Sequence, residues 1–478
     1  MTMRVLPNEY HPDELMAEKH PQSDLRRKLG LLPLTNIVIA NMVGAGIFTT
    51  SGLLMRDLGD PIIMIVLWIV GGIIALCGAL SYGQLGAAMP EAGGEYVFLS
   101  KLFHPLLGFL SGWTSFVVGF SAPIAASSIG FSEYLSRAFP EMLDWTPFTF
   151  VPAVPQKILA ILVIVLFSFI HMRGIEIGAR IQNYLTTMKV GLIVAVIVGG
   201  LMFGAGDIGH FGEGSGFSFD FAGWKTLGLS LMWIMFAYSG WNASTYLGSE
   251  IRNPSKHLPL SLFAGTGIVI VLYVGVNLML VYALSPSEMN GVLSIVGMAM
   301  GALFGHSMET IVSVLISFAL FSSLSAFIIL GPRVYYAMAR DGVFLRSISY
   351  VHPRFQVPTR SIALQGAIAS VMVLSGTFDQ ILTFMGFALS IFPLFAVLGV
   401  FRLKPDVTGG FFTSGFRVAP ILYMMTGLRI LALAYLERPF ESSIALATVV
   451  AGVPLYYILR LRSGHSPENS RGRNQTLG

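Results

Sequence analysis

Twelve apolar stretches recur along the 478 residues of this chain, and they constrain its fold more than any other feature. A helix crosses the hydrocarbon core of a bilayer with about 20 predominantly apolar residues, and most of the stretches reach that length. The expected membrane spans are residues 34–55, 62–88, 105–139, 158–171, 181–203, 226–246, 258–284, 305–338, 361–377, 380–401, 418–436 and 442–459. Only 11% of the residues are charged, against about 25% in ordinary soluble domains. The sequence therefore predicts an all-α membrane protein with twelve transmembrane helices.

Cysteine, histidine and carboxylate usage excludes several kinds of site. Cys77 is the only cysteine, so the chain can form neither an internal disulfide nor a cysteine-rich metal centre. The nine histidines show no metal-ligand spacing within a span. A membrane-embedded enzyme would need a convergent set of catalytic groups, and the spans contain almost no carboxylates. We therefore expect no metal, no cofactor and no enzymatic activity.

The distribution of basic residues predicts the orientation in the membrane. If both termini are cytoplasmic, the lysines and arginines favour the cytoplasmic side by roughly four to one. We expect a multi-pass protein of the cell (plasma or inner) membrane, with residues 1–28 as a cytoplasmic N-terminal segment. Residues 463–478 are polar and are expected to form a disordered cytoplasmic tail. The basic charge thus sets topology and does not indicate a nucleic-acid partner.

Two of the spans contain a break in helix propensity. The first span reads NMVGAGIF at residues 41–48, and the sixth reads FAYSGWN at residues 236–242. Glycine disfavours a helix by roughly 1 kcal/mol relative to alanine, and unwound backbone persists in a membrane only where it is buried or lines a polar cavity. Close packing of helices at small residues is the alternative explanation for either break alone.

The placement of the two breaks favours a transport site. Five spans separate the starts of the two broken helices, so these helices enter the membrane from opposite faces. Glycine-interrupted helices at corresponding positions of two halves are the sequence pointer to an inverted-repeat transporter. We expect a first repeat at residues 29–204 (helices 1–5), a second repeat at residues 224–402 (helices 6–10) and two peripheral helices at residues 403–462.

Five motifs carry a resemblance to a known family. They are GAGIF at 44–48, PEAGGEY at 90–96, FAYSGWN at 236–242, EIRNP at 250–254 and RVYYAMARDG at 333–342. In this order they resemble the amino acid–polyamine–organocation superfamily, and within it most closely the L-type amino acid transporter family. The resemblance implies the LeuT-type fold of five plus five helices, with helices 1 and 6 unwound around a midplane site. Eukaryotic L-type light chains carry an external cysteine for a heavy subunit, whereas Cys77 lies in the second span, so no disulfide-linked heavy chain is expected.

Backbone groups at the two breaks could hold an amino acid. A half-helix N-terminus offers free amides and a positive dipole end to a carboxylate, and we expect the amides of Ala45 and Gly46 to bind it. The resemblance implies that the carbonyls of Met42, Phe236 and Ser239 hold the ammonium group. The complete expected substrate site comprises Met42, Val43, Gly44, Ala45, Gly46, Ile47, Phe236, Ala237, Ser239 and Asn242.

Side chains near the breaks have expected roles of their own. The resemblance implies that Phe236 lies over the substrate as a gate, and the alternative is an aromatic side chain that packs in the core or faces lipid. Ser322, Ser323 and Ser325 cluster in the eighth span. They could face the substrate cavity or bond to carbonyls of their own helix.

Lys189 is the ninth residue of the fifth span, about 12 Å deep by helical rise. Intramembrane charges mark functional sites by default, and the alternative is a lysine that holds spans together at helix-end carbonyls. The resemblance places Lys189 near the position where sodium-coupled relatives hold an ion. This coupling role predicts sodium-independent transport, and coupling to protons remains an open alternative.

These expectations combine into a function. We predict a secondary active transporter for sodium-independent uptake or exchange of neutral L-amino acids, because no acid pair or basic pocket faces either break. A proton-coupled symporter of amino acids, or of a related amine or polyamine, is the alternative. A channel is a further alternative, but two broken helices and one buried lysine suit a single occluded site better than a continuous ion pathway. The expected partners are the amino acid substrate, the lipid bilayer and, for the alternative, protons.

Overall fold

The computed structural model describes residues 29–91, 93–143, 154–173, 175–214, 216–340, 343–350, 352–355, 357–403 and 417–462. Over these residues the regular structure is helical, and ten helices are long and apolar enough to cross a membrane. This result confirms the predicted all-α, multi-pass membrane fold. The segments expected at residues 1–28 and 463–478 lie outside the described residues.

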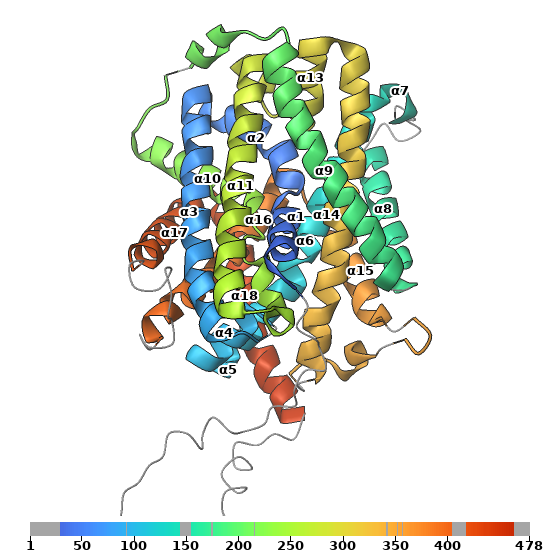
Figure 1. The fold of residues 1–478 in the computed structure, drawn as a ribbon, viewed down its shortest axis with the longest axis vertical. Coiled ribbons are helices and arrows are strands. Elements are labelled where there is room, and N and C mark those ends of the chain that lie inside the picture. Colours follow the sequence, from blue (N-terminus) through green and yellow to red (C-terminus); the bar gives the residue numbers. More distant parts are fainter. Residues whose placement is uncertain are drawn as a thin grey trace, which may run out of the picture.

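The long helices pack side by side in one bundle (Figure 1). The uninterrupted ones are α3 (Pro61–Ala88), α8 (Val154–Met172), α9 (Ile175–Phe203), α11 (Pro254–Ala283), α14 (His306–Arg340), α16 (Phe378–Gly399), α17 (Val418–Glu437) and α18 (Pro439–Arg462). One further span is continuous through a π-helical turn: α5 (Pro105–Thr114), η2 (Ser115–Gly119) and α6 (Ser121–Ala138). The span nearest the N-terminus is divided into α1 (Leu31–Met42) and α2 (Ala45–Leu58).

Three shorter apolar helices complete the apolar set. The segments expected as spans at 226–246 and 361–377 form α10 (Phe221–Ala237) and α15 (Thr359–Ser375), and α13 (Ile295–Phe304) lies where no span was expected. The remaining short helices are α4 (Glu95–Leu102), α7 (Pro140–Leu143), η3 (Ile208–Gly212), η4 (Ala243–Glu250), α12 (Pro286–Met289), η5 (Arg346–Ser349) and η6 (Val400–Arg402). Helices α4 and α13 lie at opposite ends of the bundle (Figure 1).

The turn between α2 and α3 shows how local sequence sets the helix ends. Gly59 ends α2 in the left-handed conformation, with φ of 61°, which glycine adopts without steric cost. The Asp60 carboxylate then accepts a hydrogen bond from the Ile63 amide at 3.0 Å, and Pro61 occupies the first helical position. An aspartate N-cap followed by proline is a strong helix start, so α3 begins directly after α2 ends.

Near the end of the bundle that holds α4, the entry to α1 is tied to the end of η4. The Leu29 amide donates to the Glu250 carbonyl at 3.0 Å, and the Arg252 amide donates to the Leu29 carbonyl at 2.9 Å. These two bonds form an isolated parallel bridge between Leu29 and Ile251. The Ser244 hydroxyl adds a bond to the Leu34 carbonyl at 3.3 Å. We call this set of contacts the α1–η4 clasp.

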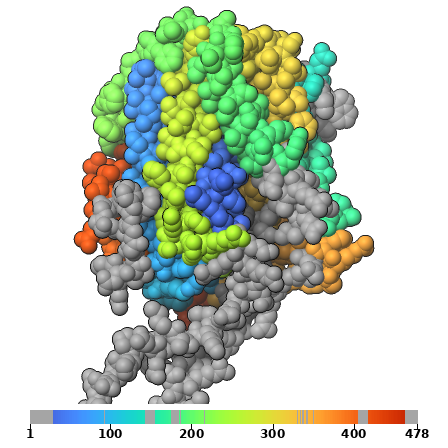
Figure 2. Space-filling model, in the orientation of Figure 1, coloured from blue at the N-terminus to red at the C-terminus, as the bar shows by residue number. Residues whose placement is uncertain are grey.

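Large apolar side chains cover much of the outer surface of the bundle. Val271 of α11 is 72% exposed, Val165 of α8 is 57% exposed and Leu428 of α17 is 58% exposed. The face in Figure 2 is formed largely by α3, α11 and α9 lying next to one another. Apolar surface of this extent is expected where lipid, and not water, surrounds the protein.

Candidate functional site

The first helix is interrupted for two residues inside the bundle. The helix α1 ends at Met42, the Val43 amide still donates to the Ile39 carbonyl at 2.9 Å, and Gly44 is extended with φ of −131° and ψ of −159°. The next helix, α2, begins at Ala45 without a side-chain cap. The carbonyl end of one half-helix therefore lies beside the amide end of the next, and their dipoles offer negative and positive poles to a ligand.

The second interruption follows α10. The Ser239 amide donates to the Phe236 carbonyl at 2.8 Å, and turns carry the chain from Tyr238 to Asn242 before η4 begins. Gly240 has φ of +99°, a left-handed conformation that favours glycine. A Cβ atom at Gly240 would lie 2.8 Å from the Asn41 carbonyl carbon, so glycine is also needed for contact with α1.

The two interruptions lie against each other. A Cβ atom added to Gly46 would stand 2.6 Å from the Ala237 Cα atom, so α2 packs directly on the end of α10. Val43 and Ile47 are fully buried. Phe236 and Ala237 are also buried, at 8% and 3% exposure. The structure thus brings the predicted residues of both breaks into one region, while Ser239 and Asn242 are half-buried at its edge.

Tyr273 of α11 joins the two interruptions through its hydroxyl group. It lies 2.7 Å from the Met42 carbonyl oxygen and 3.0 Å from the Ala237 carbonyl oxygen. One phenolic proton can satisfy only one acceptor fully, so the two carbonyls share it. Sequence reasoning missed this residue, since a single tyrosine in an apolar span carries no local signal of its partners.

Lys189 of α9 reaches the first interruption. The ammonium donates to the Val43 carbonyl, to the Ala40 carbonyl at 3.3 Å and to the Ser323 hydroxyl at 3.3 Å. The side chain is fully buried, and no carboxylate within the described chain forms an ion pair with it. The cation therefore sits on the carbonyl end of α1, where the helix dipole favours positive charge.

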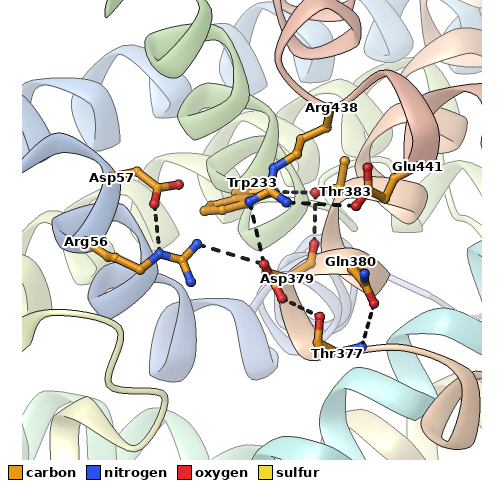
Figure 3. Close-up of polar contacts among 9 residues, drawn as sticks. All are labelled: Arg56, Asp57, Trp233, Thr377, Asp379, Gln380, Thr383, Arg438 and Glu441. Carbon is orange, nitrogen blue, oxygen red and sulfur yellow. Dashed lines mark hydrogen bonds and ion pairs between the residues drawn. The ribbon is translucent and has the colours of Figure 1, made fainter.

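Charged side chains join helix ends at the end of the bundle opposite α4 (Figure 3). Asp379 at the start of α16 lies 3.9 Å from the Arg56 guanidinium of α2 and 3.7 Å from the Arg438 guanidinium at the start of α18. We call Arg56, Asp379 and Arg438 the Asp379 charge cluster. Next to it, the Thr383 hydroxyl donates to the Asp379 carbonyl at 2.8 Å and receives the Trp233 indole N–H at 3.1 Å. Helices α2, α10, α16 and α18 are therefore linked at this end.

The helix α2 also contacts the segment that carries α12 and α13. The Gly291 amide donates to the Gly52 carbonyl at 2.8 Å, and a Cβ atom at Gly52 would lie 2.1 Å from the Val292 carbonyl oxygen. The Tyr134 hydroxyl of α6 donates to the Phe48 carbonyl and accepts from the Val296 amide at 3.2 Å. Backbone contacts thus close this side of the bundle over α2.

Comparison with known proteins gives a consistent family. The sequence profile described as amino acid permease matches residues 29–436. The chain is 28% identical to the serine/threonine exchanger SteT of Bacillus subtilis (strain 168), with 92% of this chain and 98% of that protein covered. It is 27% identical to the cystine/glutamate transporter of Homo sapiens, covering 91% and 85%. It is 25% identical to the large neutral amino acids transporter small subunit 2 of Mus musculus, covering 92% and 85%.

Proposed function

Because the chain belongs to the amino acid permease family, we propose that it moves neutral L-amino acids across the cell membrane without sodium, as a secondary active transporter that works by exchange or uptake. The protein is a transporter and not an enzyme. The observation that carries the finer proposal is the contact between two interrupted helices, with the Lys189 ammonium on the Val43 carbonyl of one of them. Unwound backbone of this kind suits a small zwitterion.

The substrate is held by backbone groups in this proposal. The amides of Ala45 and Gly46 begin a helix without a side-chain cap, which favours a carboxylate at that end. The carbonyls of Met42, Phe236 and Ser239 bind the ammonium group, and the Phe236 ring closes over the substrate as a gate. The remaining positions of the site are Val43, Gly44, Ile47, Ala237 and Asn242.

Lys189 makes a sodium ion unnecessary in this proposal. Its ammonium occupies a position bounded by two carbonyl oxygens and the Ser323 hydroxyl. Hard cations such as metal ions bind clusters of oxygen ligands of this kind. A covalently attached cation therefore takes the place of an exchangeable one and couples the site to α9 and α14.

The architecture belongs to the same proposal. Twelve spans form two five-helix inverted repeats at residues 29–204 and 224–402, and residues 403–462 supply two further helices. Both termini lie in the cytoplasm. No disulfide-linked heavy chain is needed, because Cys77, the only cysteine, is buried in α3.

Exchange is the first candidate mode, and proton symport is the second. The Bacillus subtilis relative is a serine/threonine exchanger and the human relative is a cystine/glutamate transporter, which supports coupling of two amino acid fluxes. A titratable amine at the break keeps a proton-coupled symporter of amino acids, or of a related amine or polyamine, as the alternative.

Uptake of labelled neutral L-amino acids into proteoliposomes tests the proposal. We expect uptake to rise when the lumen holds unlabelled amino acid, and to be equal in sodium and choline buffers. Uptake that needs a sodium gradient would refute the role of Lys189. Uptake driven by an inward proton gradient, with no stimulation by internal amino acid, would replace exchange by symport.

A further inference from the structure

Glu95 is a carboxylate buried beside the second interruption. It begins α4, is 8% exposed, and lies outside the membrane-spanning helices. The Asn242 amide group donates to one carboxylate oxygen at 3.0 Å, and the Ser111 hydroxyl donates to the other at 3.4 Å. Asn242 precedes η4 and Ser111 belongs to α5, so this single carboxyl group joins the second interruption to α5.

Two glycines place this carboxylate in the interior. Gly93 and Gly94 have φ of +128° and +53°, so the chain turns in left-handed conformations directly before Glu95. A Cβ atom at Gly94 would lie 2.8 Å from the Tyr246 ring. The turn is therefore packed tightly against η4, and it leaves the Glu95 side chain buried.

The groups that face Glu95 are aromatic and polar. Its titratable neighbours are tyrosines, namely Tyr82 of α3, Tyr246 of η4 and Tyr423 of α17. The rings of Tyr82 and Trp241 pack edge to face with their centroids 4.8 Å apart. No lysine or arginine in the described residues pairs with Glu95, and the nearby Lys101 pairs with Glu91 instead.

A buried carboxylate without a counterion binds a proton readily. Burial raises the pKa of Glu95 to about 7, and the hydrogen bonds that its carboxylate accepts from Asn242 and Ser111 limit that rise. The desolvation cost falls on the charged form alone. Near neutral pH the buried arrangement therefore gains or loses one proton, whereas a hydrated carboxylate would stay ionised.

We propose that Glu95 is a proton-binding site on the α4 side of the bundle, and that its proton holds α4 and α5 against the broken helix. The proposal rests on the proposed function, because alternating access requires that this side open. Opening separates Asn242 from Ser111 and hydrates the carboxylate. The proton is then released to the side on which α4 lies, so the group senses pH on that side and does not carry a proton across.

The sign of the effect follows from linkage. The buried, closed arrangement binds the proton more tightly than the open one, so acid favours closure and the stabilisation is lost as pH rises through about 7. If opening returns the pKa of Glu95 to 4.5, the closed-to-open ratio is about tenfold larger at about pH 6 than at about pH 8.

The experiment compares Glu95→Gln with the matched control Glu91→Gln in proteoliposomes, with pH varied on each side in turn. For the natural protein and the control, we expect acidification of the α4 side from about pH 8 to about pH 6 to slow transport by up to about tenfold. Glu95→Gln keeps the group neutral, so this response should disappear. If transport by Glu95→Gln slowed on acidification as much as transport by the natural protein, the proposal would be overturned.

Two further measurements cover a variant that fails to fold or a chain that moves no amino acid. Ser111→Ala removes a donor that stabilises the ionised form, so the midpoint of the pH response should shift to higher pH; an unchanged midpoint would count against the site. Infrared difference spectra of the purified protein should show a protonated carboxyl band that titrates near pH 7, persists in Glu91→Gln and vanishes in Glu95→Gln. That band tests the proton site even if the proposed transport function is wrong.

Discussion

Replacement of Lys189 by methionine tests the role of the buried ammonium most directly. Methionine keeps an unbranched side chain of similar length, so the change removes charge and donors without opening a large cavity. The carbonyls of Val43 and Ala40 lose their contact with the ammonium, and Ser323 loses a donor. The first interruption is then left with acceptors that no cation neutralises.

The contacts set the size of the effect. A hydrogen bond to a charged group contributes about 1.5–3 kcal/mol, so the two carbonyl contacts of Lys189 sum to about 3–6 kcal/mol before the cost of burying the ammonium is subtracted. We expect about 1–3 kcal/mol to be lost from the transport step, which lowers the rate roughly 5- to 150-fold.

The assay is the initial rate of labelled amino acid uptake into proteoliposomes, normalised to correctly folded protein and repeated in sodium and choline. The control is Lys225→Met, because Lys225 forms a half-exposed ion pair with Glu437 at 3.0 Å. Such a pair contributes about 0–1 kcal/mol, so the control should lose less than about fivefold. Unchanged uptake by Lys189→Met, or equal losses in both variants, would refute the reasoning.

Three other perturbations have expected outcomes. Tyr273→Phe leaves the Met42 and Ala237 carbonyls without their shared donor, so it should lower the free energy of unfolding by about 1–3 kcal/mol and also slow transport. The control Tyr238→Phe removes a bond to the Trp68 carbonyl and should lower stability without slowing transport. Equal transport by the two variants would contradict a link between the breaks. Gly52→Ala should slow transport at least about fivefold, because its Cβ meets backbone, whereas Gly191→Ala, with open space around it, should be neutral in the same uptake assay. Asp379→Asn should change the free energy of unfolding by less than about 1 kcal/mol, since the Asp379 charge cluster is partly exposed, and a larger loss would contradict that expectation.

The sequence was sufficient for the features that repeat or carry local signals. Apolar length predicted the long helices, and glycine with polar residues predicted where helices 1 and 6 would be interrupted. The sixth span was predicted at 226–246 with a break at 236–242, and α10 ends at Ala237, inside that break, before η4 begins at Ala243. The contact of Gly240 with α1 was not predictable, because it depends on a helix about two hundred residues away in the chain.

Contacts between distant segments could not be predicted from one sequence. Tyr273 and Glu95 both lie at positions whose neighbours in the chain give no sign of their partners. Ser323 was left between two alternatives, and it bonds to the Val43 carbonyl and to Lys189 across helices. The α13 helix was also missed, because its ten residues are too few to be read as a span.

The α1–η4 clasp has a mechanical consequence. Two backbone hydrogen bonds and the Ser244–Leu34 contact join α1 to η4. The halves of the two interrupted helices that lie toward α4 are therefore bonded to each other. We therefore expect α1 and η4 to move together when that side of the bundle opens. A pair of spin labels across the clasp should then keep a constant separation through the cycle, while the distance from either label to α5 changes.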